Sequence, residues 1–332
     1  MKEQTRGGIK TEIKAKTLLS ISVQLPLLLE QQAINSRFQK FENELVELDS
    51  EISNQKNYLT KLRQAILQEA IEGKLTAGWR IKNPVEKGDP DTDAAALLET
   101  IKAEKQKLIS EEKIKKEKPI TPINPDDLPF SLPEGWVWVR LNELINPQRA
   151  LTYGIVKMEN EPKNGGVKAL RCSDVRFRFI DNSKIRRVSE KISEQFSRTV
   201  LVGEEILLNV RGTLGGCAIT DKNHVGYNIA REVSLIVLIN TTLNRHVLNV
   251  LTSPFFNQVI EDNLRGIAYK GLNLNLLSNF LIPLPPLAEQ HAIVERVDCL
   301  LVTVNALDQQ VQDRKTYAEQ LMQAVLKEAF AG

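Results

Sequence analysis

The fold is decided by one stretch at residues 24–73, QLPLLLEQQAINSRFQKFENELVELDSEISNQKNYLTKLRQAILQEAIEG. Its apolar residues recur at alternating steps of four and three, a spacing that keeps a narrow seam on one side of a helix. The seam consists of Ile34, Phe38, Phe41, Leu45, Leu48, Ile52, Leu59, Leu62 and Ile66. This spacing predicts a long coiled-coil helix over residues 24–73.

The same stretch occurs a second time at the end of the chain. A shift of about 259 positions, without a gap, aligns residues 23–73 with residues 282–332, and about 19 of the 51 aligned pairs are identical. The second seam consists of Ile293, Val297, Leu300, Val304, Leu307, Val311, Leu321 and Val325, with Ala318 in phase. Because residues outside the seam are also shared, we interpret residues 282–332 as a duplicated coiled-coil helix.

Each seam is interrupted once, at the same place. Gln55 breaks the first seam and Arg314 breaks the second. A polar residue in a coiled-coil seam costs stability but fixes the register or the number of partners. We therefore interpret the two interruptions as a device that controls how the helices pair.

The composition excludes several classes of protein. No apolar run in the 332 residues approaches the roughly 18 to 20 residues of a membrane span, and the first residues are too polar for a secretory signal. The three cysteines, Cys172, Cys217 and Cys299, are widely separated, which argues against a disulfide framework and a cysteine-ligated metal site. We expect a cytoplasmic protein that does not contact a membrane.

The chain between the two helices predicts a linker followed by a new domain. Residues 74–127 contain glycines and prolines, a charged helix at 94–118 whose lysines we interpret as a solvated face, and then a proline-rich segment. Residues 128–281 predict a mixed α+β or α/β domain with its own core. Its strand-like runs lie at 136–141, 167–170, 205–210, 217–220 and 232–239, and its helical runs lie at 244–252 and 254–263.

Residues 1–23 align with the end of that domain under the same shift. Arg6-Gly7 matches Arg265-Gly266, and residues 17–23 fall opposite residues 276–282. We interpret residues 1–23 as the remnant of the end of a missing first domain. The alternative is a disordered tail.

The sequence contains no motif that would carry catalysis. An adenine methyltransferase requires a glycine-rich turn for its methyl donor and usually an Asn/Asp-Pro-Pro-aromatic loop, and an ATP-driven translocase requires a Gly-x-x-x-x-Gly-Lys-Ser/Thr loop; none of these occurs. Asp91 and Glu111-Glu112-Lys113 are residue types that suit Mg²⁺, but they lie in a charged linker and helix where such spacing arises by chance. We predict no catalytic residue, no metal site and no cofactor.

Positive charge is concentrated in one part of the predicted domain. Residues 168–187 carry seven Lys and Arg against two Asp, and glycine-containing loops lie at 153–157, 210–216 and 265–271. Arginine binds phosphate or pairs with guanine in the major groove, and glycine allows the backbone to approach a partner closely. The candidate contact residues in these segments are Tyr153, Lys157, Arg171, Arg176, Arg178, Arg211, Thr213, Tyr269 and Lys270. The alternative for each is an ordinary turn with an exposed side chain, and Trp136 and Trp138 are interpreted as core.

Three segments and the duplicated helices resemble a known family, the specificity (S) subunits of Type I restriction-modification systems. The segments are LPEGWVWVRL at 132–141, GEEILL at 203–208 and LIPLPPLAEQ at 281–290. The resemblance runs from about residue 6 to the end of the chain. It implies that the two long helices pack as an antiparallel coiled coil and act as a spacer. It also implies a target recognition domain that reads half of a split site in double-stranded DNA, docked methyltransferase (M) subunits, and restriction (R) subunits bound through them. Similar glycine-flanked positions in the family lie toward DNA, so the resemblance implies that the candidate contact residues named above are DNA-binding residues.

The chain departs from the family pattern in one respect. Members typically carry two recognition domains, whereas both helices and only the second domain are predicted here. Two copies could form a homodimer with two domains, another chain could supply a complementing half-subunit, or the chain could be an inactive or silent recombination cassette. A coiled-coil scaffold without a DNA role is a further alternative. We expect a non-catalytic DNA specificity subunit.

Overall fold

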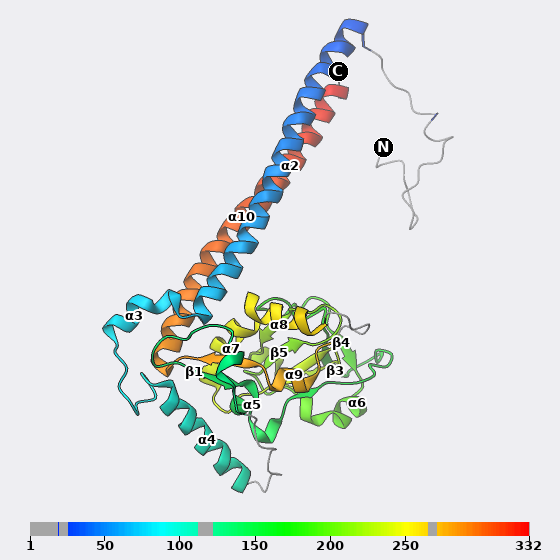
Figure 1. The fold of residues 1–332 in the computed structure, drawn as a ribbon. Helices are drawn as coiled ribbons and strands as arrows, with labels where there is room; N and C mark the ends of the chain where they lie inside the picture. The colour runs from blue at the N-terminus through cyan, green and yellow to red at the C-terminus, as the bar shows by residue number, and fades with distance from the viewer. Residues whose placement is uncertain (1–18, 20–25, 112–121, 265–270, 332) are drawn as a thin grey trace. The chain divides into compact units, whose positions relative to one another are not determined.

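The computed structural model describes residues 19, 26–111, 122–264 and 271–331 (Figure 1). The chain divides into two compact units, residues 1–58 with 308–332 and residues 59–307. The helices are α2 (Leu28–Ile71), α3 (Ala77–Lys82), α4 (Ala94–Glu111), α5 (Leu141–Leu144), α6 (Glu190–Gln195), α7 (Asn244–Leu251), α8 (Pro254–Leu264), α9 (Leu274–Ser278) and α10 (Leu287–Ala331). The strands are β1 (Val137–Arg140), β2 (Thr152–Tyr153), β3 (Val167–Leu170), β4 (Arg186–Val188), β5 (Ile206–Asn209), β6 (Cys217–Ile219), β7 (Asn228–Ile229), β8 (Val233–Ile236) and β9 (Leu281–Leu284). None of the described helices is both long and apolar enough to cross a membrane.

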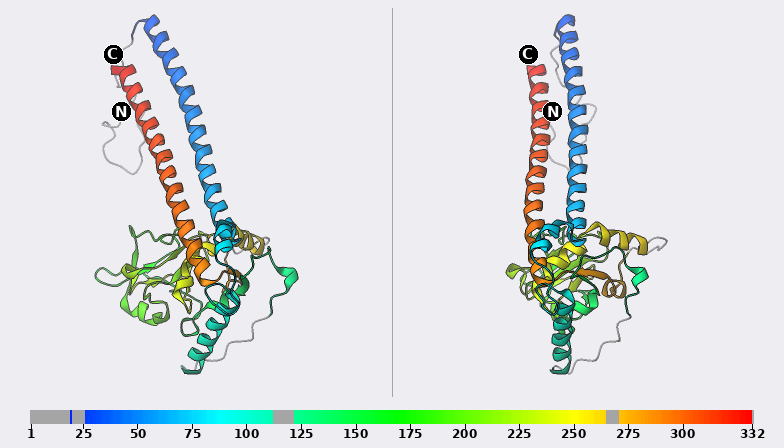
Figure 2. Two further views of the ribbon diagram at one scale, coloured as in Figure 1. Left: turned by 90° about the vertical axis from the view of Figure 1, so that its left-hand side faces the viewer. Right: turned by 60° about the vertical axis from the view of Figure 1, so that its left-hand side comes forward.

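The first unit contains the outer parts of α2 and α10, which lie side by side in each view (Figures 1 and 2). The Lys56 ammonium donates a hydrogen bond to Gln312 Oε1 at 3.0 Å. A groove between the two helices is lined by α2 residues from Phe38 to Ile52 and by α10 residues from Lys315 to Met322. Residue numbers therefore run in opposite directions along the pair, which confirms the antiparallel arrangement.

Each predicted seam consists of two rows of residues, and they differ in burial. One row is buried in the stretch where the helices pair: Ile52, Leu59 and Ile66 on α2 and Val297, Val304 and Val311 on α10. The other row includes Leu48, Leu62, Leu307 and Leu321, whose exposed fractions are 37%, 44%, 41% and 54%. Of the remaining seam residues, Ile293 is buried, and Ile34, Phe38, Phe41, Leu45, Leu300 and Val325 are half-buried. The helix pair thus buries one row and leaves four leucines of the other row at the surface.

The second unit contains the mixed α+β domain. Its largest sheet has the strand order β2-β8-β5-β6, and every neighbouring pair in it is antiparallel. A second sheet has the order β4-β3-β7, and β1 pairs with β9. All residues of β5 and β8 are buried, as expected of strands that cross a core, and α7 packs on β6 and β9. The strands predicted at 167–170, 205–210, 217–220 and 232–239 and the helices predicted at 244–252 and 254–263 are confirmed as β3, β5, β6, β8, α7 and α8.

The end of the domain differs from the sequence prediction. The predicted boundary at residue 282 lies inside β9, which pairs with β1 so that Val137 is opposite Leu284. Pro283 is tolerated there because β9 has only one strand neighbour, so one side of it needs no ladder hydrogen bond. The second long helix begins at Leu287, directly after two prolines. The predicted helix at 94–118 is seen as α4, and residues 112–121, like residues 1–18, lie outside the described part of the chain.

The start of α10 is held by a buried carboxylate. Glu289 is 1% exposed and accepts hydrogen bonds from Trp136 Nε1 at 2.7 Å and from Thr76 Oγ1 at 2.6 Å. It also forms an ion pair with Arg80. Trp136 is 6% exposed, which confirms its predicted place in the core. Glu289 therefore joins the segment after α2, the strand β1 and the helix α10.

Candidate nucleic-acid interface

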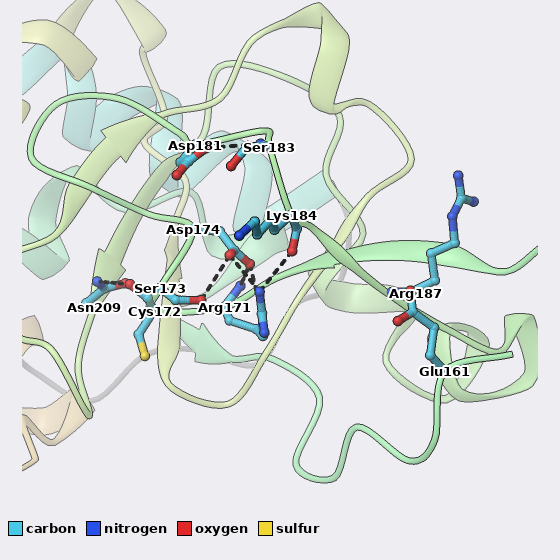
Figure 3. Close-up of polar contacts among 10 residues, drawn as sticks. All are labelled: Glu161, Arg171, Cys172, Ser173, Asp174, Asp181, Ser183, Lys184, Arg187 and Asn209. Carbon is cyan, nitrogen blue, oxygen red and sulfur yellow. Dashed lines mark hydrogen bonds and ion pairs between the residues drawn. The ribbon is translucent and has the colours of Figure 1, made fainter. Parts of the chain in front are cut away.

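Two segments that carry predicted DNA-binding residues meet at the end of β5. Asn209 is the last residue of this strand, and its side chain is 1% exposed. Its Nδ2 donates to the carbonyl oxygens of Cys172 at 2.9 Å, Val175 at 3.0 Å and Thr213 at 3.1 Å (Figure 3 shows the bond to Cys172). One side chain thus connects the loop after β3, residues 171–180, with the loop after β5, residues 210–216.

The base of loop 171–180 is braced by an internal ion pair. Arg171 donates to Asp174 through Nε at 3.1 Å and through Nη2 at 2.9 Å, and Nη2 also donates to the Lys184 carbonyl oxygen at 3.0 Å (Figure 3). Hydrogen bonding to Asp174 raises the pKa of Arg171. The Arg171 guanidinium was predicted to contact DNA, but its hydrogen bonds to Asp174 and Lys184 hold it within the chain.

Arg178 fixes the tip of the same loop. Its φ of +66° lies in the left-handed region that is unfavourable for a residue with a Cβ. Its Nη1 donates to Asn249 Oδ1 of α7 at 2.7 Å, and its Nη2 lies 3.9 Å from Asp298 Oδ1 of α10. Burial lowers the pKa of Arg178, and only 14% of its side chain is exposed. Arg178 thus holds the loop against two helices instead of extending from it.

The side chains on either side of Arg178 are exposed. Arg176 lies at the surface, and its backbone N–H donates to the Phe179 carbonyl oxygen at 2.9 Å to close the turn. Phe177 and Phe179 are 41% and 59% exposed. Sequence reasoning named Arg176 but missed the two phenylalanines. The available signal was two large apolar residues within the most basic segment of the chain.

A second cluster surrounds Arg211. Its guanidinium carbon lies 5.4 Å from the centre of the Tyr153 ring, and its backbone pairs with Gly271. Tyr153 OH donates to the Leu272 carbonyl oxygen at 3.3 Å. The structure therefore brings together the predicted loops at 153–157 and 210–216. Lys157 is exposed, and Tyr269 and Lys270 lie outside the described residues.

Two glycines of these loops are needed for contacts within the chain. A Cβ on Gly154 would lie 2.0 Å from the Ile229 carbonyl oxygen, and a Cβ on Gly216 would lie 2.3 Å from the Val175 carbonyl oxygen. Both distances are far below van der Waals contact. The close approach that we expected toward a partner is therefore, at these two positions, an approach to the domain's own backbone.

The two loops line a groove of about 1200 Å³. Its lining includes Arg176, Phe177 and Thr213 of the loops, Gln64 of α2, and Asn257 and Gln258 of α8. Arginine suits phosphate or guanine, and side-chain amides suit adenine. The groove therefore combines residue types that read DNA bases. Across the described ranges, no group of three or more His, Cys, Asp or Glu side chains is arranged to hold a metal ion.

Comparison with known proteins gives consistent matches. The family model "Type I restriction modification DNA specificity domain" matches residues 133–313. The Type I restriction enzyme EcoBI specificity subunit of Escherichia coli is 28% identical over 324 residues, which cover 96% of this chain and 60% of that protein. The EcoEI specificity subunit of Escherichia coli is 28% identical over 288 residues, which cover 81% of this chain and 43% of that protein. The chain thus spans 60% or less of the length of these two relatives.

The fold also matches a solved structure. It is described as "Structural basis underlying complex assembly and conformational transition of the type I R-M system", with a TM-score of 0.55 and 18% identity. The alignment covers 99% of this chain and 66% of that chain. At this level of identity the match concerns the fold alone, and it agrees with two long helices and a mixed domain.

Proposed function

This chain belongs to the Type I restriction modification DNA specificity family, and we propose that it reads one half of a bipartite site in double-stranded DNA without catalysing a reaction itself. We propose that residues 128–281 form the target recognition domain, that residues 24–73 and 282–332 form the spacer, and that residues 74–127 link them. Methylation and cleavage would then belong to M and R subunits bound to this chain in the cytoplasm.

The observation that carries the proposal is the joining of loops 171–180 and 210–216 at Asn209. It brings exposed Arg176 and Thr213 together in the lining of a single groove. Direct reading of a base pair requires several polar groups held in a fixed arrangement beside the groove of the duplex. Loop 171–180 begins directly after β3, and loop 210–216 connects β5 with β6, which supports such an arrangement.

The contributions of the predicted residues differ within this proposal. Arg176, Thr213, Lys157 and the Arg211–Tyr153 pair contact DNA. Arg171 and Arg178 act by holding loop 171–180, because their guanidinium groups already bind Asp174, Asn249 and Asp298. Tyr269 and Lys270 stay predictions from the sequence.

The exposed row of the helix pair supports docking of M subunits. Leu48 and Leu307 occupy equivalent positions of the repeat, as do Leu62 and Leu321, and all four are exposed. The exposed leucines of α2 and those of α10 thus form two equivalent apolar sites on antiparallel helices, and such a pair of sites suits two identical M subunits. R subunits would join through the M subunits.

The complex of this chain with a compatible M subunit provides the test. Its affinity for genomic DNA fragments is measured in increasing salt, where binding through phosphates weakens linearly in log–log form. A steep salt dependence with a preference among fragments is the expected result. Negligible affinity that does not change with salt would identify the chain as a coiled-coil scaffold or a silent cassette.

A further inference from the structure

We propose that Asn209 is a positioning residue for specificity: it sets the distance between loops 171–180 and 210–216 and thereby selects the DNA sequence that the domain reads. This inference rests on the proposed function, which it deepens. Asn209 is among the residues that line the groove, but it is only 1% exposed and its Nδ2 hydrogens are already donated within the chain, so its effect is exerted through the residues on the two loops.

The geometry around Asn209 is a three-way connection. The two hydrogens of Nδ2 serve three carbonyl oxygens, those of Cys172, Val175 and Thr213, at 2.9 to 3.1 Å. Because all three partners are acceptors, the orientation of the amide is determined. The Asn209 backbone N–H also donates to the Gly216 carbonyl oxygen at 2.8 Å. The strand β5 therefore holds both loops through the side chain and the main chain of one residue.

The Oδ1 atom of Asn209 indicates that the hydrogen bonds of Nδ2 are the reason for an asparagine at this position. Asn209 Oδ1 is buried, and no described residue donates a hydrogen bond to it. A buried acceptor without a donor is unfavourable. An apolar side chain would remove that unsatisfied acceptor but would leave the three carbonyl groups without their shared donor.

The two loops carry the side chains that face the groove. Arg176 and Phe177 lie one and two residues after Val175, and Thr213 is itself a partner of Asn209. Recognition requires the groups that contact the ligand to be held within about 0.5 Å of their productive positions. Loss of the connection therefore changes base discrimination, whereas phosphate contacts by flexible basic side chains tolerate a small shift.

Asn228 provides a matched control in the same domain. It is also fully buried, and its Nδ2 donates to Ser193 Oγ at 3.0 Å and to the Phe196 carbonyl oxygen at 3.3 Å. Its Oδ1 accepts from Thr199 Oγ1 at 2.6 Å. Asn228→Ala therefore removes a comparable buried amide from a part of the domain that does not belong to either loop.

The experiment compares Asn209→Ala and Asn228→Ala in the full chain bound to a compatible M subunit. The probes are a duplex with the motif that the wild-type complex methylates and the same duplex with one half-site scrambled. We expect Asn209→Ala to lower the ratio of the affinity for the intact duplex to that for the scrambled duplex by about 10-fold or more, a loss typical of mismatched base pairs. The slope of log affinity against log salt concentration should stay unchanged, because the phosphate contacts remain. We expect Asn228→Ala to keep the ratio within about two-fold of wild type.

Gly216→Ala tests the same connection from the other side. The added Cβ would lie 2.2 Å from Asn209 Nδ2 and 2.3 Å from the Val175 carbonyl oxygen, so the loops must separate. If Asn209→Ala does not fold, the ratio of the two affinities is measured with Gly216→Ala instead. A folded variant of either kind that keeps the wild-type ratio, or an equal loss in Asn228→Ala, overturns the inference. A wild-type complex that shows no preference between the duplexes contradicts the proposed function instead.

Discussion

The indole Nε1 of Trp136 donates a hydrogen bond to Oε2 of Glu289 over 2.7 Å, and both side chains are buried. The equivalent of Glu289 in the first copy of the repeat is Glu30, which is exposed and accepts a hydrogen bond from the backbone of Leu27. The duplicated sequence therefore occupies two different environments. In the second copy, the carboxylate joins a helix to a domain.

Replacing Glu289 should destabilise the domain. Glu289→Gln removes the charge opposite Arg80 and turns a donor toward Trp136 or Thr76, so we expect a loss of about 2 to 4 kcal/mol in the free energy of unfolding. Glu30→Gln is the matched control and should change it by less than about 0.5 kcal/mol. Denaturant unfolding measures both. Equal effects of the two changes would show that Glu289 does not hold the helix.

The two substitutions Arg178→Ala and Arg178→Gly separate the side-chain contacts from the backbone conformation. Both remove the bond to Asn249, but only alanine retains a Cβ at a φ of +66°. We expect both to lower thermal stability and alanine to be worse by about 1 kcal/mol. If alanine is the more stable of the two, the left-handed conformation is not a source of strain.

Arg176 should contribute to DNA affinity without affecting the fold. Its side chain is exposed on the groove, so Arg176→Ala should weaken DNA binding by about 1 to 3 kcal/mol with an unchanged melting temperature. Lys222→Ala removes an exposed cation outside the predicted loops and serves as the control. Identical affinities of the two variants, measured by titration of labelled duplex at one salt concentration, would remove Arg176 from the interface.

The two seam rows should respond differently to charge. Ile52 is 4% exposed and Leu48 is 37% exposed. Ile52→Asp buries a carboxylate without a partner and should reduce stability by about 3 to 5 kcal/mol. Leu48→Asp should leave the melting temperature nearly unchanged and weaken binding of the M subunit in a pull-down titration. Full M-subunit binding by Leu48→Asp would argue against docking on this row.

Stability should fall in acid because of His246. This side chain is fully buried, its Nε2 lies 2.7 Å from the Pro283 carbonyl oxygen, and burial lowers its pKa from 6.5 to about 4. The unfolded chain therefore binds a proton more readily than the folded one. The destabilisation is absent above pH 6.5 and grows as pH falls toward 4, where it reaches on the order of 3 kcal/mol. His246→Gln should flatten this part of the stability profile, and an unaltered profile would exclude His246 as its cause.

The sequence was most informative where the pattern is local or repeated. The heptad spacing and the shared off-seam residues predicted both long helices, and apolar runs predicted β3, β5, β6 and β8. The strand β9 was not predicted, because the prolines around Pro283 are typical of the segment just before a helix. A strand forms there because it pairs with β1, which is far away in the sequence.

The candidate site could be predicted only in part, because contacts made after folding decide which charges remain exposed. Arg171, Arg176 and Arg178 look alike in the sequence. Asp174 engages the first, while Asn249 and Asp298, far along the chain, engage the third. Asn209 gave no signal at all, since its importance depends on the three carbonyl groups around it.

Recognition of a half-site by this chain is tested most directly by a map of modified adenines in a host genome that co-expresses the chain with a compatible M subunit. We predict a split motif that depends on the chain, and we expect Arg176→Ala to abolish or change the half-site that this chain reads. A palindromic motif would show that two copies form the reader, since identical domains related by a two-fold axis read identical half-sites. A non-palindromic split motif would show that another chain supplies the second half. No modified motif, with both proteins soluble and bound to each other, would contradict a role of this chain in DNA recognition.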